Sequence, residues 1–252
     1  MWDPAVYARF GTERSRPFFD LTGRIGAGHP RTVVDLGCGD GSLTVTLAER
    51  WPQARVTGID SSPEMIAKAV ARGGPVRFEQ GDLREWRPGP EVDVLVTNAA
   101  LQWVPEHREL LRRWAGELPA GAWIAMQVPG NFDAPSHRLL REVADRHGVR
   151  DQARDAPVDG PAAYANLFLT LGATVDAWGT TYVHLLSDEG PEHPVLRWME
   201  GTALRPVKAA LDDNAWQSFR ADLDRELVAA YPAAHGYVAF EFHRVFVVAR
   251  TA

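Results

Sequence analysis

The chain has 252 residues, of which 45% are hydrophobic and 24% are charged, close to the average of a soluble globular domain. This composition excludes a largely disordered chain, because it provides enough apolar surface to build a core. The 33 acidic and 27 basic side chains give a formal charge of −6 without a basic tract, which argues against nucleic acid as a partner.

Several kinds of protein are also disfavoured by what the sequence lacks. No apolar stretch approaches the roughly 18 residues of a membrane span, and the N-terminus does not resemble a signal peptide. A single cysteine, Cys38, cannot form an intramolecular disulfide or a cysteine-based zinc site. The eight histidines show no metal-ligand spacing. We therefore expect a cytoplasmic protein with no metal and no membrane partner.

Strand and helix patterns alternate through the first half of the chain. Short apolar runs bounded by turn residues predict strands at 31–36, 55–59, 76–79, 92–97 and 123–128. Helices are predicted between them at 43–50, 62–72 and 109–118, the second of which begins with Ser62 as its N-cap. This alternation is typical of a doubly wound α/β fold with a parallel sheet and right-handed crossovers.

The pattern becomes less regular after Pro129. Helices are predicted at 135–147 and 162–171, strands at 174–186 and 241–249, and a mostly helical segment at 194–231 that is broken at Arg205-Pro206. We expect a single domain over residues 1–252, with a ligand-binding core at 30–130. A cap over the sheet is expected from residues 1–25, 131–165 and 190–235.

The sharpest motif is the glycine loop Asp35-Leu36-Gly37-Cys38-Gly39-Asp40-Gly41, which lies directly between the first predicted strand and helix. Glycines there allow a tight turn and let a ligand approach the main chain. Both dinucleotides and S-adenosylmethionine are bound by such loops. Here the third glycine of G-x-G-x-x-G is missing, and Asp35 would repel a pyrophosphate but attract an ammonium group. The loop thus favours S-adenosylmethionine, with NAD as the alternative.

Two further acids follow the second and third predicted strands. Asp60 can accept hydrogen bonds from both hydroxyls of a ribose, and Asp82 can accept one from an adenine amino group. The backbone amide of Leu83 can donate to a ring nitrogen. A helix-start acid and a turn acid are the structural alternatives. Because parallel strands end at one edge of a sheet, three acids after three strands are stronger evidence together than separately.

These residues resemble the class I S-adenosylmethionine-dependent methyltransferases over residues 30–130. The resemblance implies a Rossmann-like, mostly parallel seven-stranded sheet with an antiparallel last strand, and S-adenosylmethionine as the cofactor. It also implies a set of cofactor contacts at the carboxyl edge of the sheet: Asp35, Gly37, Cys38, Gly39, Asp60, Ser61, Asp82, Leu83 and Asn98.

A narrower resemblance covers nearly the whole chain. Stretches at 1–4, 60–65, 98–105, 127–132, 135–137, 178–182 and 193–196 are similar to a subgroup that forms monomethyl esters of small tricarboxylic acids. It implies methylation of a carboxylate of trans-aconitate or a close polycarboxylate. Residues 150–159 and 235–237 are less similar. The alternatives are another small-molecule O-, N- or C-methyltransferase and a non-catalytic cofactor-binding protein.

A carboxylate substrate sets the chemistry that we expect. It is already ionised at pH 7, so it needs no general base, and the protein has only to position it and exclude water. Cationic and hydrogen-bonding residues would bind the other carboxylates. The candidates are Arg14, Arg16, Arg205, Arg244, His137, His184 and Tyr182, with Gln127 and Asn131 to orient a carboxylate and Trp103 as a wall of the site. From these we predict substrate contacts by Arg14, Trp103, Gln127, Tyr182, His184 and Arg205, and no catalytic role for Cys38.

Overall fold

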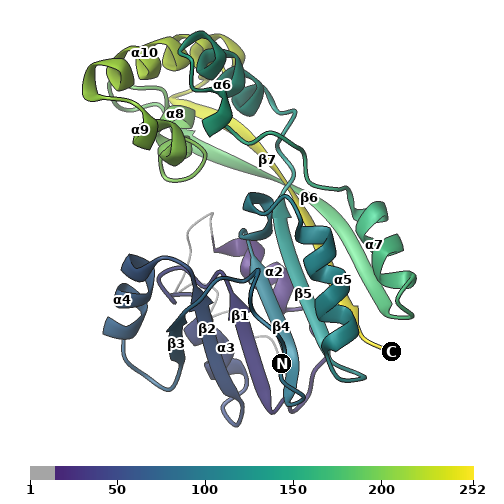
Figure 1. Ribbon diagram of the computed structural model, residues 1–252. Helices are drawn as coiled ribbons and strands as arrows, with labels where there is room; N and C mark the ends of the chain where they lie inside the picture. The colour runs from purple at the N-terminus through teal and green to yellow at the C-terminus, as the bar shows by residue number, and fades with distance from the viewer. Residues whose placement is uncertain (1–14) are drawn as a thin grey trace. The chain divides into compact units, whose positions relative to one another are not determined.

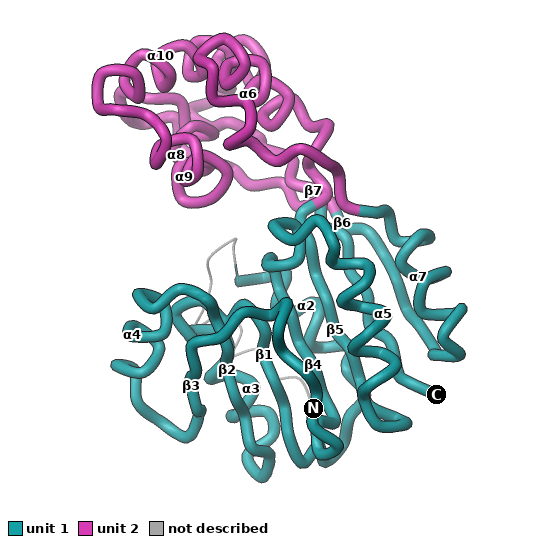
Figure 2. The backbone as a smooth tube through the Cα atoms, viewed as in Figure 1, with its two compact units in different colours: residues 1–129, 159–180, 244–252 teal, residues 130–158, 181–243 magenta. Residues whose placement is uncertain are grey.

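A computed structural model describes residues 15–252, which divide into two compact units (Figure 2). The first unit contains the described residues up to 129 together with residues 159–180 and 244–252. The second contains residues 130–158 and 181–243. The sheet strands β6 (Thr174–Ser187) and β7 (Tyr237–Arg250) each contribute residues to both units.

A seven-stranded sheet forms the centre of the first unit, in the order β3-β2-β1-β4-β5-β7-β6 (Figure 1). The other strands are β1 (Thr32–Leu36), β2 (Arg55–Asp60), β3 (Arg77–Gln80), β4 (Val92–Asn98) and β5 (Trp123–Pro129). The pairs among β1–β5 are parallel, and β7 runs antiparallel to β5. The predicted fold, including its antiparallel last strand, is confirmed. All five residues of β1 are buried, as expected for a central parallel strand.

The helices described in the first unit are α2 (Arg16–Thr22), α3 (Thr44–Arg50), α4 (Pro63–Ala71), the short η1 (Leu101–Trp103), α5 (His107–Glu117) and α7 (Pro161–Leu169). They include the four that were predicted there, together with α2 and η1, which were not. Ser62 is the N-cap of α4, because its side chain accepts a hydrogen bond from the Met65 amide. The apolar face of α5 buries Leu110, Leu111 and Trp114, and this burial stabilises the helix more than its intrinsic propensity does.

The second unit has its own hydrophobic core. Its helices are α6 (Pro135–Arg146), η2 (Arg150–Gln152), α8 (Pro194–Glu200), α9 (Arg205–Ala210) and α10 (Asp213–Ala230). Leu140, Phe219 and Phe240 belong to this core and are at most 3% exposed. Residues 15–25 and 159–165 of the expected cap lie in the first unit, and the second unit also contains residues 181–189 and 236–243, which were not part of the expected cap.

The predicted helix break at Arg205-Pro206 was wrong. The turns lie at 201–204 and 211–212, and α9 begins at Arg205 with Pro206 in its first turn. Proline is compatible with that position because the first N–H groups of a helix have no intrahelical acceptor. The proline therefore marks a helix start.

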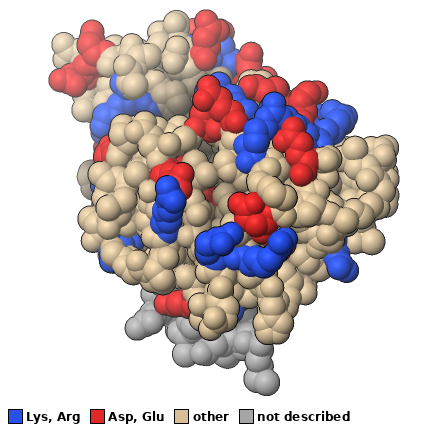
Figure 3. Space-filling view, turned by 60° about the horizontal axis from the view of Figure 1, so that its bottom comes forward, with Lys and Arg blue, Asp and Glu red and all other residues tan. Residues whose placement is uncertain are grey.

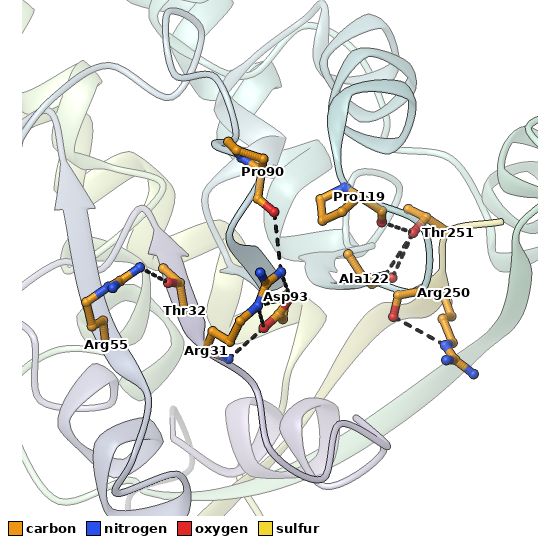
Figure 4. Close-up of polar contacts among 10 residues, drawn as sticks. Arg31, Thr32, Arg55, Pro90, Asp93, Pro119, Ala122, Arg250 and Thr251 are labelled. Carbon is orange, nitrogen blue, oxygen red and sulfur yellow. Dashed lines mark hydrogen bonds and ion pairs between the residues drawn. The ribbon is translucent and has the colours of Figure 1, made fainter.

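Side chains at the amino edge of the sheet hold neighbouring strands together (Figure 4). The Arg31 guanidinium binds the Asp93 carboxylate at 2.7 Å, and the Arg31 amide donates to the same carboxylate at 2.6 Å. The Thr251 hydroxyl accepts a hydrogen bond from the Ala122 amide at 2.9 Å and donates to the Pro119 carbonyl at 2.6 Å. The end of the chain is thereby fixed to the turn before β5.

The surface mixes charges of both signs. On the face in Figure 3, basic and acidic side chains lie side by side. Exposed ion pairs of the protein include Arg24–Asp176 and Arg87–Glu117. Pairs of this kind contribute little to stability. Within residues 15–252, no helix is long and apolar enough to cross a membrane.

The Thr251 contacts predict a measurable contribution to stability. Thr251→Val keeps the side-chain volume but removes the hydroxyl contacts with the Ala122 amide and the Pro119 carbonyl. Those two groups still bond each other at 3.1 Å, so we expect a loss of about 0.5–1.5 kcal/mol in the free energy of unfolding. Urea unfolding followed by circular dichroism measures it. Thr251→Ser keeps the hydroxyl and is the control. Equal midpoints for the valine variant and the parent protein would contradict this account.

Candidate functional site

The glycine loop after β1 contains glycines with two different roles. Gly37, Gly39 and Gly41 all have positive φ angles, of 79°, 57° and 74°. A Cβ atom at Gly37 would lie 2.4 Å from the Ala100 Cβ, and one at Gly41 would lie 2.5 Å from the Phe78 ring, so both glycines are required by packing. Among residues 15–252, a Cβ at Gly39 would meet no atom within 4 Å. Gly39 therefore adjoins open space in which a ligand can approach the backbone.

Asp35 is a buried carboxyl group below this loop. It is 3% exposed, and its Oδ2 accepts a hydrogen bond of 2.6 Å from the Thr44 hydroxyl. Burial and, to a smaller extent, the charge of Asp60 raise the pKa of Asp35, the Thr44 hydrogen bond lowers it, and the net result is a pKa of about 6. A cation bound nearby would lower this pKa, so the site favours a positively charged ligand group.

Asp60, at the end of β2, is oriented by two backbone amides. Its Oδ2 accepts a hydrogen bond of 2.9 Å from the Gly39 amide, and its Oδ1 accepts one of 2.9 Å from the Ser62 amide. Each carboxylate oxygen can accept a further hydrogen bond. The two oxygens are thus held in place with acceptor capacity for a diol. The neighbouring Ser61 is exposed.

Asp82 lies after β3 and has a partner that the sequence analysis missed. The Arg84 guanidinium binds both carboxylate oxygens, Oδ2 at 2.5 Å and Oδ1 at 3.0 Å, and the Arg84 amide donates to Oδ1 at 2.8 Å. The Arg84 hydrogen bonds hold the pKa of Asp82 below its usual value. Among the described residues, the amide of Leu83 has no acceptor, as a ligand-binding amide requires.

Strand register places several polar residues in one row across the sheet. Asp35 pairs with Gly58 of β2 and with Val96 of β4, while Asn98 pairs with Gln127 of β5. Paired residues share a face, and residues two apart on a strand share it too. Asp60, Asp35, Asn98 and Gln127 therefore lie on the same face, near the carboxyl ends of the parallel strands.

The row continues onto β7 with Arg244. Gln127 pairs with Phe246, and Pro129 pairs with Arg244, two residues from Phe246 and hence on the same face. The Arg244 guanidinium donates to the Gln127 Oε1 at 3.2 Å, and the two side chains are 6% and 1% exposed. The row is thus acidic at β2 and β1, neutral at β4 and β5, and basic at β7.

Two amide side chains in the row have buried atoms without partners. Within the part of the chain that the structure describes, Asn98 Oδ1 and Gln127 Nε2 form no hydrogen bond. Such buried orphan groups are costly and commonly mark ligand contacts. Trp103 follows in η1 and is 49% exposed, so its ring is available to a ligand.

Other predicted substrate residues lie in the second unit. Tyr182 and His184 are buried on one face of β6, with their rings nearly parallel, and the His184 ring stacks on Trp198 at 4.6 Å. His137 is a poor cationic clamp, because burial and the charges of Arg154 and Arg141 lower its pKa to about 3. It is neutral at pH 7.

The remaining candidates differ in their surroundings. Asn131 has both functions of its amide bound to the His243 backbone, at 3.0 and 2.7 Å, which is a structural role. Arg205 is exposed, and Arg16 is paired with Asp20 at 3.8 Å. Arg14 lies outside the described residues.

Neither a metal site nor a reactive thiol is evident. No group of three or more His, Cys, Asp or Glu residues in the described chain is arranged to hold a metal ion. Burial and the nearby charges of Asp35 and Asp60 raise the pKa of Cys38 far above its usual value. The Cys38 thiol is thus protonated at neutral pH and is a poor nucleophile.

The fold and this edge of the sheet define a class, the methyltransferases built on a Rossmann-like sheet with an antiparallel last strand. Residues 33–121 match the family described as "Methyltransferase domain". The YcgJ protein of Bacillus subtilis has a similar structure, with a TM-score of 0.59 and 13% identity, over 93% of this chain and 97% of that one. Phosphoethanolamine N-methyltransferase 2 of Haemonchus contortus, in complex with S-adenosyl-L-methionine, gives a TM-score of 0.54 at 15% identity, over 94% and 53%. At sequence identities this low, these structural similarities are evidence for the fold alone.

Closer relatives define the family. A trans-aconitate 2-methyltransferase of Mycobacterium sp. (strain KMS) is 55% identical over 100% of both chains. The proteins of that name from Rhodococcus jostii and Mycobacterium tuberculosis are 54% and 50% identical, over 99% of this chain and 99% and 96% of theirs. The chain belongs to the trans-aconitate 2-methyltransferase family. The glycine loop was compatible with a methyltransferase and with an NAD-binding protein. The family membership decides in favour of a methyltransferase.

The different surroundings of the loop glycines predict different effects of alanine. Gly41→Ala should destabilise the protein, because its Cβ would overlap the Phe78 ring. Gly39→Ala should cost only the strain of a positive φ angle, about 1–2 kcal/mol, but weaken ligand binding. Thermal unfolding and calorimetric titration of adenosylhomocysteine separate the two effects. The account fails if Gly39→Ala binds this ligand as tightly as the parent protein.

The raised pKa of Asp35 predicts a pH-dependent stability. Between its ordinary value of 3.8 and about 6, the folded protein keeps a proton that the unfolded chain releases. The free energy of unfolding should therefore fall as pH rises through this window, by on the order of 3 kcal/mol. Asp35→Asn removes this contribution and can still accept the Thr44 hydrogen bond.

The free energy of unfolding of Asp35→Asn should therefore rise relative to that of the parent protein as the pH increases from 4 to 7. Urea unfolding at each pH measures it. A difference that is the same at both pH values would show that Asp35 ionises normally.

Proposed function

We propose that this protein transfers a methyl group from S-adenosylmethionine to a carboxylate of trans-aconitate, or of a close small polycarboxylate, and forms a monomethyl ester. The observation that carries the proposal is the 55% identity, over the full length of both chains, to a relative named for this activity. The site adds independent support, since its acidic end suits a cationic cofactor and its basic end suits an anionic substrate.

The residues at the carboxyl edge of the sheet fit S-adenosylmethionine. Asp60 would accept the ribose hydroxyls, since two amides hold its oxygens in place. Asp35 would attract the ammonium group, and Gly37, Cys38 and Gly39 would line the amino acid portion with main chain. The free Leu83 amide and the Asp82 carboxylate would bind the adenine, and the orphan Asn98 oxygen and Ser61 complete the set. When bound, this cofactor supplies an electrophilic methyl group on a sulfonium.

The residues of this chain then act by positioning. A carboxylate with a pKa near 4 is ionised at neutral pH, so no side chain has to remove a proton. Holding a nucleophile in line at about 3 Å can contribute roughly 7–11 kcal/mol to catalysis. Charge disperses in the transition state, so exclusion of water also favours the reaction. The protonated Cys38 thiol would not compete for the methyl group.

The remaining assignments stay predictions. Trp103 would wall the site, and Gln127 would contact the substrate. Arg14, Tyr182, His184 and Arg205 are the other predicted substrate contacts.

The test is direct detection of the ester. We expect that incubation with S-adenosylmethionine and trans-aconitate yields a monomethyl ester and adenosylhomocysteine in equal amounts, measured by chromatography with mass spectrometry. The rate should not show a basic limb assignable to a general base. Absence of an ester from every di- and tricarboxylate in a panel would refute the proposal.

Asp60→Ala tests the cofactor site, and Glu79→Ala is its matched control. Loss of the charge-assisted hydrogen bonds of Asp60 should weaken adenosylhomocysteine binding by about 1.5–3 kcal/mol in calorimetric titration. Glu79→Ala, at an exposed ion pair of the neighbouring β3, should leave that affinity unchanged. Equal losses in both variants would indicate a general effect on folding.

A further inference from the structure

The connection between β4 and α5 (residues 99–106) begins with a backbone conformation that alanine rarely adopts. Ala99, the first residue after β4, has a φ angle of 55°, in the left-handed region. For a residue other than glycine this region is disfavoured by about five- to thirtyfold, because the Cβ atom lies close to the following carbonyl oxygen. Such a conformation persists only where its surroundings fix it, and residues of this kind cluster at functional sites.

Both polar groups of the Ala99 main chain are bound by glutamines. The Ala99 amide donates to the Gln127 carbonyl at 2.9 Å. The Ala99 carbonyl accepts a hydrogen bond of 2.6 Å from the Gln102 side chain. The first contact joins two main chains and is compatible with any side chain at position 127. The second depends on the amide of Gln102, which is therefore the side chain that fixes the conformation of Ala99.

The conformation of Ala99 determines where the next residue meets the glycine loop. A Cβ atom at Gly37 would lie 2.4 Å from the Ala100 Cβ, so the two segments approach as closely as a glycine permits. A displacement of Ala100 would remove a contact that fixes Gly37. The turn continues to Trp103, whose amide donates to the Ala100 carbonyl at 3.1 Å, so Trp103 would move with Ala100.

The other polar atom of the Gln102 amide costs stability. A carbonyl oxygen only accepts hydrogen bonds, so the Gln102 Nε2 group faces Ala99 and Oε1 is the remaining atom. This Oε1 is buried, and no donor to it exists among residues 15–252. A buried acceptor without a partner is unfavourable, and local conflicts of this kind are expected where function constrains a residue.

We propose that Gln102 is a positioning residue of the cofactor site, which holds Ala99 in its left-handed conformation and thereby keeps Ala100 against Gly37. This inference rests on the proposed function for the identity of the ligand at the glycine loop. Gln102 acts through the conformation of the β4–α5 connection and not by contact with the ligand. A ligand binds only the fraction of molecules in which its site is formed, so loss of the Gln102 contact lowers the apparent affinity as that fraction falls.

The test is a double-mutant cycle measured by calorimetric titration of adenosylhomocysteine. Gln102→Met keeps the approximate length of the side chain but removes the donor to the Ala99 carbonyl. We expect this variant to bind at least about fivefold more weakly than the parent protein, because the strained conformation is no longer held. Ala99→Gly should bind within about twofold of the parent, because glycine adopts a positive φ without strain.

The combined variant, Gln102→Met with Ala99→Gly, decides the mechanism. Its affinity should return to within about twofold of that of Ala99→Gly, because a glycine at position 99 does not need the Gln102 contact. A side chain that contacts the ligand directly would show the same loss with alanine or glycine at position 99, and that result would overturn the proposal. Parental affinity in Gln102→Met would overturn it too.

Gln217→Met is the matched control, because Gln217 is exposed on α10 in the second unit. Its affinity for adenosylhomocysteine should equal that of the parent. Thermal unfolding of every variant separates positioning from general destabilisation. A merely structural role of Gln102 would lower the unfolding midpoint and leave the affinity of the folded protein at the parental value.

The two proposals can fail separately. The expected pattern of adenosylhomocysteine affinities, without ester formation from any polycarboxylate, would refute the proposed function and leave the role of Gln102 standing. Ester formation with no loss of affinity in Gln102→Met would do the reverse. A parent protein that does not bind adenosylhomocysteine would overturn both.

Discussion

The alignment of parallel strands at one edge is the constraint on which the site depends. Backbone hydrogen bonds fix the register of β2, β1, β4 and β5, and this register places Asp60, Asp35, Asn98 and Gln127 on one face near one edge. A shift of one residue in any strand would move its polar side chain to the other face. The arrangement of the site is therefore a consequence of the pairing that stabilises the sheet.

The acidic end of the row illustrates a conflict between stability and binding. A carboxyl group as buried as Asp35 costs free energy when it ionises, and its raised pKa is the measure of that cost. The Thr44 hydrogen bond compensates only in part. A cationic ligand would reverse the balance, because it lowers the pKa and stabilises the charged form. The surrounding core, with β1 buried along its whole length, tolerates this local cost.

Local patterns predicted the sheet and the acidic end of the site, because their signals lie within short segments. The glycine loop, Asp60 and the Ser62 cap each follow from a few adjacent residues and were visible before the fold was known. The Gln127–Arg244 contact joins residues 117 positions apart and depends on the β5–β7 register, so no local pattern contains it. Arg84 was missed because its pairing with Asp82 depends on rotamers in a turn. Pro206 misled because proline suits both a break and a first turn.

The polarity of the row also suits the two ligands of opposite charge that the proposed function requires. In methyl transfer from a sulfonium to a carboxylate, a cation and an anion become neutral products, so a uniform field would favour one reactant and repel the other. Under the proposed function, a row that is acidic at β1 and basic at β7 would draw each reactant to its own end, with the uncharged Asn98 and Gln127 amides between them. Because neither amide titrates, this middle region keeps its character across the pH range in which the substrate is ionised. A substrate with an alcohol or amine nucleophile would need a base there, and the described residues of the row place none on β4 or β5.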